Sequence, residues 1–144
     1  MTDKLHIAVL MGGWSAEREV SLMSGNDIAD ALESLGHKAS RIDMDRNIAM
    51  VLTELRPDVV FNALHGSPGE DGTVQGMLDL MQIPYTHSGL ETSVIAIDKE
   101  LTKKVLVPHG IPMPDGLIVE SENLYAADPM PRPYVLKPVN EGSS

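Results

Sequence analysis

The continuous apolar run Leu5–Met11 is the feature that most constrains the fold of this chain. A run without polar alternation predicts a strand that is buried on both faces of its sheet. Gly12 and Gly13 end the run, and an amphipathic helical pattern follows and extends to Leu35. A strand buried on both faces needs helices on both sides of its sheet. The N-terminal region therefore predicts an α/β fold with an open parallel sheet and helices on both faces.

Strand and helix patterns continue to alternate along the chain, as in βαβ units. The predicted strands are Lys38–Asp43, Val59–Leu64 and a short extended piece, Ile83–Thr86. The predicted helices are Asn47–Arg56, Thr73–Met81 and one or two helices within Glu91–Val107. In the first helix, we expect Ser15 or Ser21 to cap the start and Gly36 to follow the end.

Two turns are expected to meet at one edge of this sheet, although they lie far apart in the sequence. Right-handed crossovers place the loops after parallel strands at the same edge, and open α/β sheets bind ligands there. The first turn is Gly12-Gly13 and the second is His65-Gly66. The sequence thus predicts a ligand crevice between them.

A second domain is expected after a change in composition. Five prolines lie between Pro108 and Pro131, which favours a boundary near residues 108–116. We expect residues 1–90 to form the α/β domain, residues 91–116 a helical connection and hinge, and residues 117–144 the start of the second domain. Leu117–Val119 and Tyr134–Leu136 are predicted as its first strands.

Composition and charge exclude several classes of function. The net charge of −10 and the lack of a Lys/Arg cluster argue against general nucleic-acid binding. The chain has no cysteine, which excludes disulfides, thiolate nucleophiles and thiolate metal sites. It shows no signal peptide and no apolar run long enough to span a bilayer, so we expect a soluble, cytoplasmic protein that does not bind membranes.

Glu17 and His65 are the first candidate site residues. Glu17 lies in a polar strand-to-helix junction, where a carboxylate could hold a substrate ammonium or simply favour the helix start through the dipole. His65 follows a buried strand, where a histidine is either a ligand-binding group or a packing or capping residue. The segment Glu70–Thr73 is interpreted as a turn with an N-cap, and the other histidines have no partner at metal-ligand spacing.

Gly12-Gly13 is either a phosphate-binding turn or only a tight turn. The pair lacks the G-x-G-x-x-G spacing of a dinucleotide site, and Asp43 is poorly placed to hold a ribose, so a hydride-transfer enzyme is disfavoured. Two lysines are further candidates. Lys99 lies on a predicted helix, where lysine is normally solvated, whereas Lys137 lies between a strand and a proline.

The chain ends shortly after a pattern typical of the start of a phosphate-binding loop. Lys137 follows an apolar run, and the last residues, 142–144, are Gly-Ser-Ser. Small residues of this kind expose backbone N–H groups to phosphate. We therefore expect the chain to be the front of a larger nucleotide-using enzyme that is cut inside its second domain.

Taken together, these segments resemble the D-alanine–D-alanine ligases, which are ATP-grasp enzymes. The resemblance is carried first by two long blocks, Ala8–Leu22 and Ala63–Gly76. Shorter matches follow in the same order, at Pro84–Thr86 with Ser88-Gly89, at Asp98-Lys99, and at Lys137-Pro138 with Glu141–Ser144. Trp14 stands where we associate the family with a small residue. The resemblance implies a Rossmann-like N-terminal domain followed by the truncated start of an ATP-grasp domain.

The resemblance also implies a reaction and a role for each candidate residue. ATP phosphorylates the carboxylate of a first D-alanine, and the amine of a second D-alanine attacks the acylphosphate, which provides a peptidoglycan precursor. Glu17 would hold the ammonium of the first D-alanine, and His65 would lie beside its reacting carboxylate. Ser143 would fix Glu17 and a closing loop. Lys99 and Lys137 would contact ATP. The ligands of Mg²⁺ or Mn²⁺ are expected outside this chain.

Several alternatives remain open at this stage. The second substrate could be D-lactate or D-serine in place of D-alanine, because the second-substrate pocket is not in this chain. The isolated chain is expected to be inactive, since it has no metal site for the transferring phosphoryl group. A homodimer through the N-terminal domain is implied by the resemblance. A non-catalytic α/β module that binds a partner or dimerises is the alternative from another class.

Overall fold

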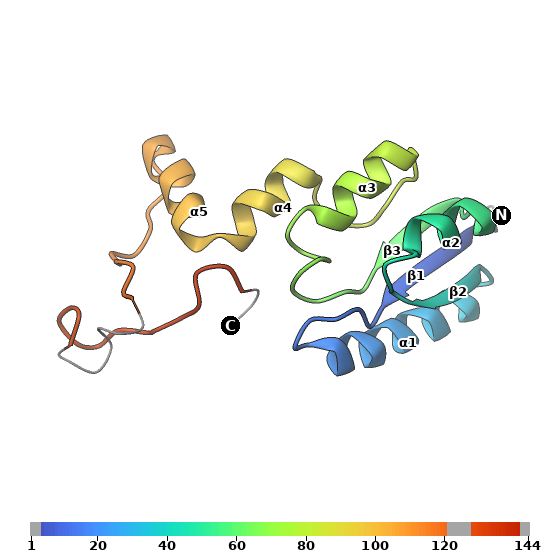
Figure 1. The fold of residues 1–144 in the computed structure, drawn as a ribbon, viewed down its shortest axis with the longest axis horizontal. Coiled ribbons are helices and arrows are strands. Elements are labelled where there is room, and N and C mark those ends of the chain that lie inside the picture. The colour runs from blue at the N-terminus through green and yellow to red at the C-terminus, as the bar shows by residue number, and fades with distance from the viewer. Residues whose placement is uncertain (1–3, 121–127, 142–144) are drawn as a thin grey trace. The chain divides into compact units, whose positions relative to one another are not determined.

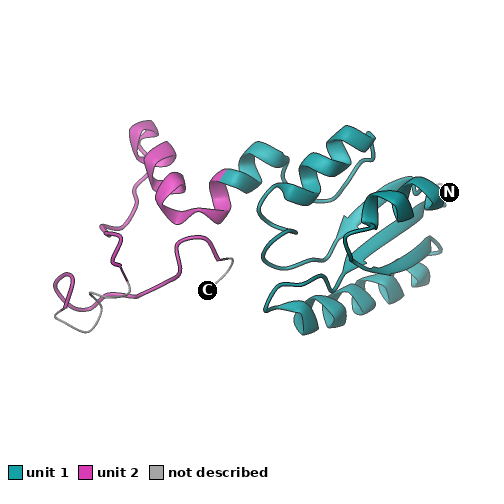
Figure 2. Ribbon diagram, in the orientation of Figure 1, with its two compact units in different colours: residues 1–94 teal, residues 95–144 magenta. Residues whose placement is uncertain are grey.

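The computed structural model describes residues 4–120 and 128–141, and its ribbon is shown in Figure 1. The chain divides into two compact units, residues 1–94 and residues 95–144 (Figure 2). The first unit contains the sheet, which is formed by β1 (His6–Met11), β2 (Lys38–Asp43) and β3 (Val59–Asn62). Its helices are α1 (Arg18–Ser34), α2 (Ile48–Leu55), α3 (Thr73–Met81) and most of α4 (Leu90–Ile97).

The sheet is parallel and has the order β2-β1-β3, so the most apolar strand lies in its centre. Ala8 on β1 pairs with Ser40 on β2 and with Val60 on β3. Beyond β3, Val60 also forms a parallel bridge to Tyr85. The Val60 N–H donates to the Pro84 carbonyl at 2.8 Å. This bridge confirms the extended piece predicted after the third helix.

Helices cover both faces of the sheet, as Figure 1 shows for α1 and α2. Alternate residues of β1 point to opposite faces because the side-chain period of a strand is two. On one face Ala8 and Leu10 pack with α2 and α3, and on the other Ile7, Val9 and Met11 pack with α1. The buried residues contributed by these helices are Ile48, Leu52, Val74 and Leu78 on the first face and Ala29 on the second. The predicted fold class of the first unit is confirmed.

The ends of α1 only partly follow the prediction. Its N-cap is Glu17, which makes no side-chain capping hydrogen bond. Ser15 lies in the turn just before the helix, and its hydroxyl accepts the Glu17 N–H at 3.2 Å, so the predicted capping role is confirmed for Ser15 in this turn and is wrong for Ser21. Ser21 lies inside the first turns of α1, because the helix begins earlier than its apolar periodicity indicates. At the other end, Gly36 adopts φ +90° and its N–H donates to the Glu33 carbonyl at 2.9 Å. The prediction that Gly36 follows the C-terminal end of this helix is therefore confirmed.

The second unit is helical where it is regular. Helix α5 (Lys99–Leu106) begins at Asp98, whose carboxylate accepts the Leu101 N–H at 2.8 Å. A 3-10 turn, Val107–His109, follows and ends at Gly110. The predicted helical segment 91–107 thus forms two helices, α4 and α5, on either side of Asp98.

The strands predicted at Leu117–Val119 and Tyr134–Leu136 are wrong, because neither segment forms a strand within residues 95–120 and 128–141. Leu117 is 55% exposed and Val135 is 78% exposed. A strand is stable only when a neighbouring strand accepts and donates its backbone hydrogen bonds, and the described part of this unit holds no such neighbour. The predicted domain limits at residues 90 and 116 stay predictions. Within the described residues, no helix is long and apolar enough to cross a membrane.

The close approach of α1 to β1 makes Gly25 a test of this packing. A Cβ added at Gly25 would lie 2.5 Å from the Met11 Cβ, which the backbone of β1 holds in place. Alanine normally favours a helix by about 1 kcal/mol over glycine, but overpacking costs about 1–3 kcal/mol. We expect Gly25→Ala to lower the free energy of unfolding, measured by urea denaturation.

Gly76 on α3 is the matched control for this substitution. A Cβ there would meet only the Leu90 Cδ1, at 2.6 Å, and this methyl group is the movable end of a flexible side chain. Gly76→Ala should therefore cost less than Gly25→Ala. A Gly25→Ala variant that is more stable than the wild type, as helix propensity alone would make it, would contradict the close packing of α1 on β1.

Candidate functional site

The turn after β1 is built from two glycines in the left-handed backbone conformation. Gly12 and Gly13 both have φ +75°. A Cβ at Gly12 would lie 2.2 Å from the Asp43 Oδ1, so only glycine fits there. The Gly12 N–H donates to the Ser21 hydroxyl at 2.9 Å. Because this N–H is bonded within the protein, the structure favours the tight-turn interpretation of the glycine pair over a phosphate-binding one.

An ion pair fastens this turn to the end of β2. Arg18 donates to both carboxylate oxygens of Asp43, at 2.6 and 2.5 Å, and to the Gly13 carbonyl at 2.9 Å. The hydrogen bonds from Arg18 lower the pKa of Asp43 despite the opposing effect of partial burial. The same hydrogen bonds raise the pKa of Arg18. Asp43 is thus part of the scaffold of the turn, which agrees with its poor placement for a ribose.

The Ser21 hydroxyl connects the turn after β1 to the end of β3. It accepts the Gly12 N–H and donates to the Ala63 carbonyl at 2.7 Å. Ser21 is completely buried. A single side chain of α1 therefore joins the carboxyl ends of the two strands that carry the candidate site residues.

Glu17 and the His65-Gly66 turn lie together, as expected from the parallel topology. A Cβ at Gly66 would lie 3.3 Å from the Glu17 Oε2, so the carboxylate reaches the backbone of the second turn. Gly66 has φ +64°, and its N–H donates to the Glu70 carboxylate at 2.8 Å. The His65 Nε2 is buried and has no hydrogen-bond partner in the part of the chain that the structure describes. The predicted convergence of the two turns is confirmed.

Two buried amide side chains shape the loop that contains His65, and the sequence prediction missed both. Asn62 Nδ2 and Gln75 Nε2 donate to the same Gly69 carbonyl, at 2.8 and 2.7 Å. Asn62 also accepts the Leu64 N–H at 3.1 Å. A polar residue that ends a buried strand, such as Asn62, is the signal that could have identified this role. Buried amides of this kind hold irregular backbone in one conformation.

The candidate residues of the second unit occupy a different environment. The Lys99 ammonium donates to the Glu141 carbonyl at 2.6 Å, and the Lys99 N–H donates to the Val139 carbonyl at 3.1 Å. Lys137 is exposed, two residues before Val139. Ser143 lies outside the described residues. Within residues 4–120 and 128–141, no group of three or more His, Asp or Glu side chains is placed to hold a metal ion.

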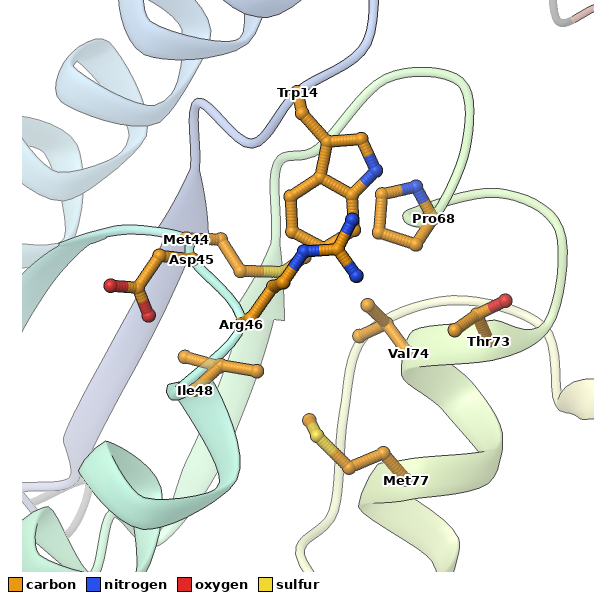
Figure 3. Close-up of a pocket in the computed structure, with 9 residues that line it drawn as sticks. All are labelled: Trp14, Met44, Asp45, Arg46, Ile48, Pro68, Thr73, Val74 and Met77. Atoms are coloured by element: carbon orange, nitrogen blue, oxygen red, sulfur yellow. The ribbon is translucent and has the colours of Figure 1, made fainter.

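An open groove lies next to the first turn, on the face of the sheet covered by α2 and α3 (Figure 3). Its volume is about 260 Å³. The Arg46 guanidinium lies 5.2 Å from the centre of the Trp14 ring, at a distance typical of cation–π contacts. Apolar side chains from both helices and the adjoining loops form most of the remaining wall, namely Met44, Ile48, Pro68, Val74 and Met77. The sequence prediction did not identify this groove, since its residues are scattered between positions 14 and 77.

Comparisons with known proteins identify relatives over the whole chain. Residues 50–88 match the family model of the D-ala D-ala ligase N-terminus. A D-alanine–D-alanine ligase of Rhizorhabdus wittichii is 80% identical over 144 residues, which is 100% of this chain and 46% of the relative. A D-alanine–D-alanine ligase of Zymomonas mobilis is 67% identical over 144 residues, and this chain covers 45% of its length. The chain thus spans about half the length of the curated relatives that it matches.

Solved structures agree with this similarity. The D-alanine–D-alanine ligase of Bacillus anthracis, solved in complex with ATP, has a TM-score of 0.70 and 39% identity. The match covers 77% of this chain and 38% of that protein. The Helicobacter pylori ligase, at 24% identity and a TM-score of 0.72, shares the fold over 96% of this chain. The resemblance inferred from the sequence motifs, to the N-terminal part of this family, is confirmed.

The ion pair between Arg18 and Asp43 leads to a prediction about pH. The folded-state pKa of Asp43 lies below its value of 3.8 in an unperturbed chain, so the carboxylate stabilises the fold above that value. This contribution is lost as the pH falls through the lower, folded-state pKa. We expect Asp43→Asn to lower the urea midpoint slightly at pH 7, because both partners are partly exposed. The difference from the wild type should shrink as the pH falls below 3.8 and vanish once the carboxylate is protonated in the folded state as well.

Asp27 provides the control. It is exposed on α1, the helix that carries Arg18, and it makes no ion pair among the described residues. Asp27→Asn should leave the midpoint near that of the wild type at neutral and at low pH. If the urea midpoint of Asp43→Asn stays below that of the wild type by the same amount at low pH, the charge of Asp43 is not the cause of the difference.

Proposed function

We propose that this chain forms the portion of a D-alanine–D-alanine ligase that binds the first D-alanine. The chain is similar throughout to the N-terminal part of such ligases. The observation that carries this proposal is the placement of the Glu17 carboxylate against the His65-Gly66 turn, at the carboxyl edge of a parallel sheet. This edge is the usual ligand-binding position in open α/β sheets. One site thus combines a carboxylate with a buried imidazole nitrogen that has no partner within residues 4–120 and 128–141.

These two groups suit the two ends of an amino acid. Glu17 is half-buried, and a carboxylate in such a position binds an ammonium group by a charge-assisted hydrogen bond. The His65 Nε2 is buried and has no partner among the described residues, and a hydrogen bond to the substrate carboxylate is proposed to satisfy it when substrate enters beside it. Holding both ends would orient the carboxylate for phosphorylation. The fixing role proposed for Ser143 concerns a residue outside the described part of the chain.

ATP is proposed as the phosphoryl donor, and Lys99 and Lys137 as groups that bind it. Both side chains are cations, which attract the negative charges of ATP. Lys137 is exposed, and the Lys99 ammonium keeps further N–H donors beside its bond to the Glu141 carbonyl. Bound ATP would supply the phosphoryl group that activates the first D-alanine, and the amine of the second would then displace phosphate. The ligands of Mg²⁺ or Mn²⁺ are proposed to lie outside this chain.

The remaining predictions from the sequence are also proposals. They comprise a homodimer formed through the N-terminal domain, a cytoplasmic location and the absence of nucleic-acid and membrane partners. The second substrate is proposed to be D-alanine, with D-lactate and D-serine as alternatives. The isolated 144-residue chain is expected to release no phosphate from ATP when D-alanine is added.

The direct test is dipeptide formation by the complete gene product that carries this chain, supplied with D-alanine, ATP and Mg²⁺. Glu17→Gln should raise the KM for D-alanine by about 30-fold, because the substrate ammonium would cover the half-buried Glu17 and loss of one partner of a covered charge pair typically costs ~2 kcal/mol or more. The KM for ATP should stay unchanged. Glu19→Gln is the matched control, since Glu19 lies two residues away on the exposed side of α1. A wild-type protein that forms no dipeptide would refute the proposed function.

A second substitution tests the nucleotide site separately. Lys137→Ala should raise the KM for ATP about 10- to 150-fold, since a charge-assisted hydrogen bond to phosphate contributes roughly 1.5–3 kcal/mol. The KM for D-alanine should not change. Lys104→Ala is the control, because Lys104 pairs with Glu100 on α5 at 2.7 Å. Equal effects of the two substitutions on the KM for ATP would remove Lys137 from the proposed site.

A further inference from the structure

We propose that Ser21 is a positioning residue for the first substrate, which sets the placement of Glu17 relative to the His65-Gly66 turn. This inference rests on the proposed function. Ser21 itself is completely buried and has no surface on which a ligand could bind. Any effect on substrate binding must therefore be transmitted through the groups that it holds.

The contacts of Ser21 reach all three segments that form the site. Its hydroxyl accepts the Gly12 N–H at the end of β1, at 2.9 Å, and donates to the Ala63 carbonyl beyond β3, at 2.7 Å. Its own N–H donates to the Glu17 carbonyl at 3.0 Å, one helical turn away. Ala63 lies two residues before His65. Ser21 therefore fixes the start of α1, which carries Glu17, against the segment that leads from β3 to His65.

A hydroxyl is required for this arrangement. A serine side chain can donate one hydrogen bond and accept another at the same oxygen, and both are used here. Alanine in its place would leave the Gly12 N–H and the Ala63 carbonyl without their partner inside the protein. Buried backbone groups without a partner are unfavourable, so the two strand ends would move to find other partners. The start of α1 and the His65-Gly66 turn would then lose their fixed separation.

Ser93 offers a close comparison in the same unit. It is also buried, at 7% exposure, and its hydroxyl donates to the Ser88 carbonyl at 3.3 Å. This bond joins Ser93 only to the segment just before its own helix α4. A general cost of removing a buried serine hydroxyl should therefore appear at Ser93 as well, whereas an effect on D-alanine binding should appear only at Ser21.

The test measures steady-state kinetics of the complete gene product with Ser21→Ala, Ser21→Cys and Ser93→Ala. We expect Ser21→Ala to raise the KM for D-alanine about 10- to 100-fold, since small misplacements of a binding group have effects of this size, and to leave the KM for ATP unchanged. Ser21→Cys keeps a weak donor and acceptor of similar size, so its increase should be intermediate. Ser93→Ala should leave both KM values unchanged.

A double substitution shows whether Ser21 acts through Glu17. In the Glu17→Gln background, Ser21→Ala should raise the KM for D-alanine no further, because the group that it positions has already been altered. If Ser21→Ala fails to fold, Ser21→Cys gives the same comparison.

The outcomes separate this inference from the proposed function. If the wild type forms the dipeptide but the Ser21 variants change only the yield of folded protein or kcat, the positioning role is refuted and the proposed function stands. Additive effects of Ser21→Ala and Glu17→Gln would also refute it. If the wild type forms no dipeptide at all, the proposed function is refuted, and the role of Ser21 with it.

Discussion

Burial of β1 on both faces is the constraint on which the first unit depends. An apolar strand in the centre of a parallel sheet must be covered by α1 on one face and by α2 and α3 on the other. This requirement fixes the crossovers and therefore brings the ends of β1 and β3 to the same edge. Helix α1 can approach β1 closely because Gly25 has no side chain to collide with Met11. The edge that is proposed to bind substrate is thus a consequence of how the core is packed.

The polar contacts at that edge are mostly internal. Ser21 and the ion pair between Arg18 and Asp43 use the donors and acceptors of the turn after β1, while Asn62 and Gln75 use the Gly69 carbonyl in the second loop. Such contacts hold backbone in place and do not bind ligands. The His65 Nε2 and the Gln75 Oε1 are both buried and have no partner among the described residues. Of the two side chains, only His65 is proposed to contact substrate, because Gln75 already holds the Gly69 carbonyl through its Nε2.

Much of the first unit could be predicted from the sequence, because its strands and helices have clear periodicity and a glycine signal ends α1. The convergence of Glu17 with the His65-Gly66 turn also followed from topology, since parallel strands place their following loops at one edge. The role of Ser21 could not be predicted in this way. A serine near a helix start is ordinarily a cap, and only the three-dimensional structure shows that it bonds to two strands.

The second unit was harder to predict for a different physical reason. Apolar runs such as Leu117–Val119 have the composition of strands, but strand formation depends on neighbours that local sequence does not reveal. The groove between Trp14 and Met77 was missed on similar grounds, because its wall is assembled from four separate segments of chain. Periodicity identifies elements, whereas surfaces formed between elements require the packed structure.

The position of Trp14 gives the protein a built-in optical probe. It is the only tryptophan in the sequence, it is half-exposed beside Arg46, and it lies three residues before Glu17 in the loop that leaves β1. Indole emission depends on solvent contact and on nearby charge. Fluorescence of the unlabelled protein should therefore report rearrangement of this loop directly, without interference from a second indole within the chain.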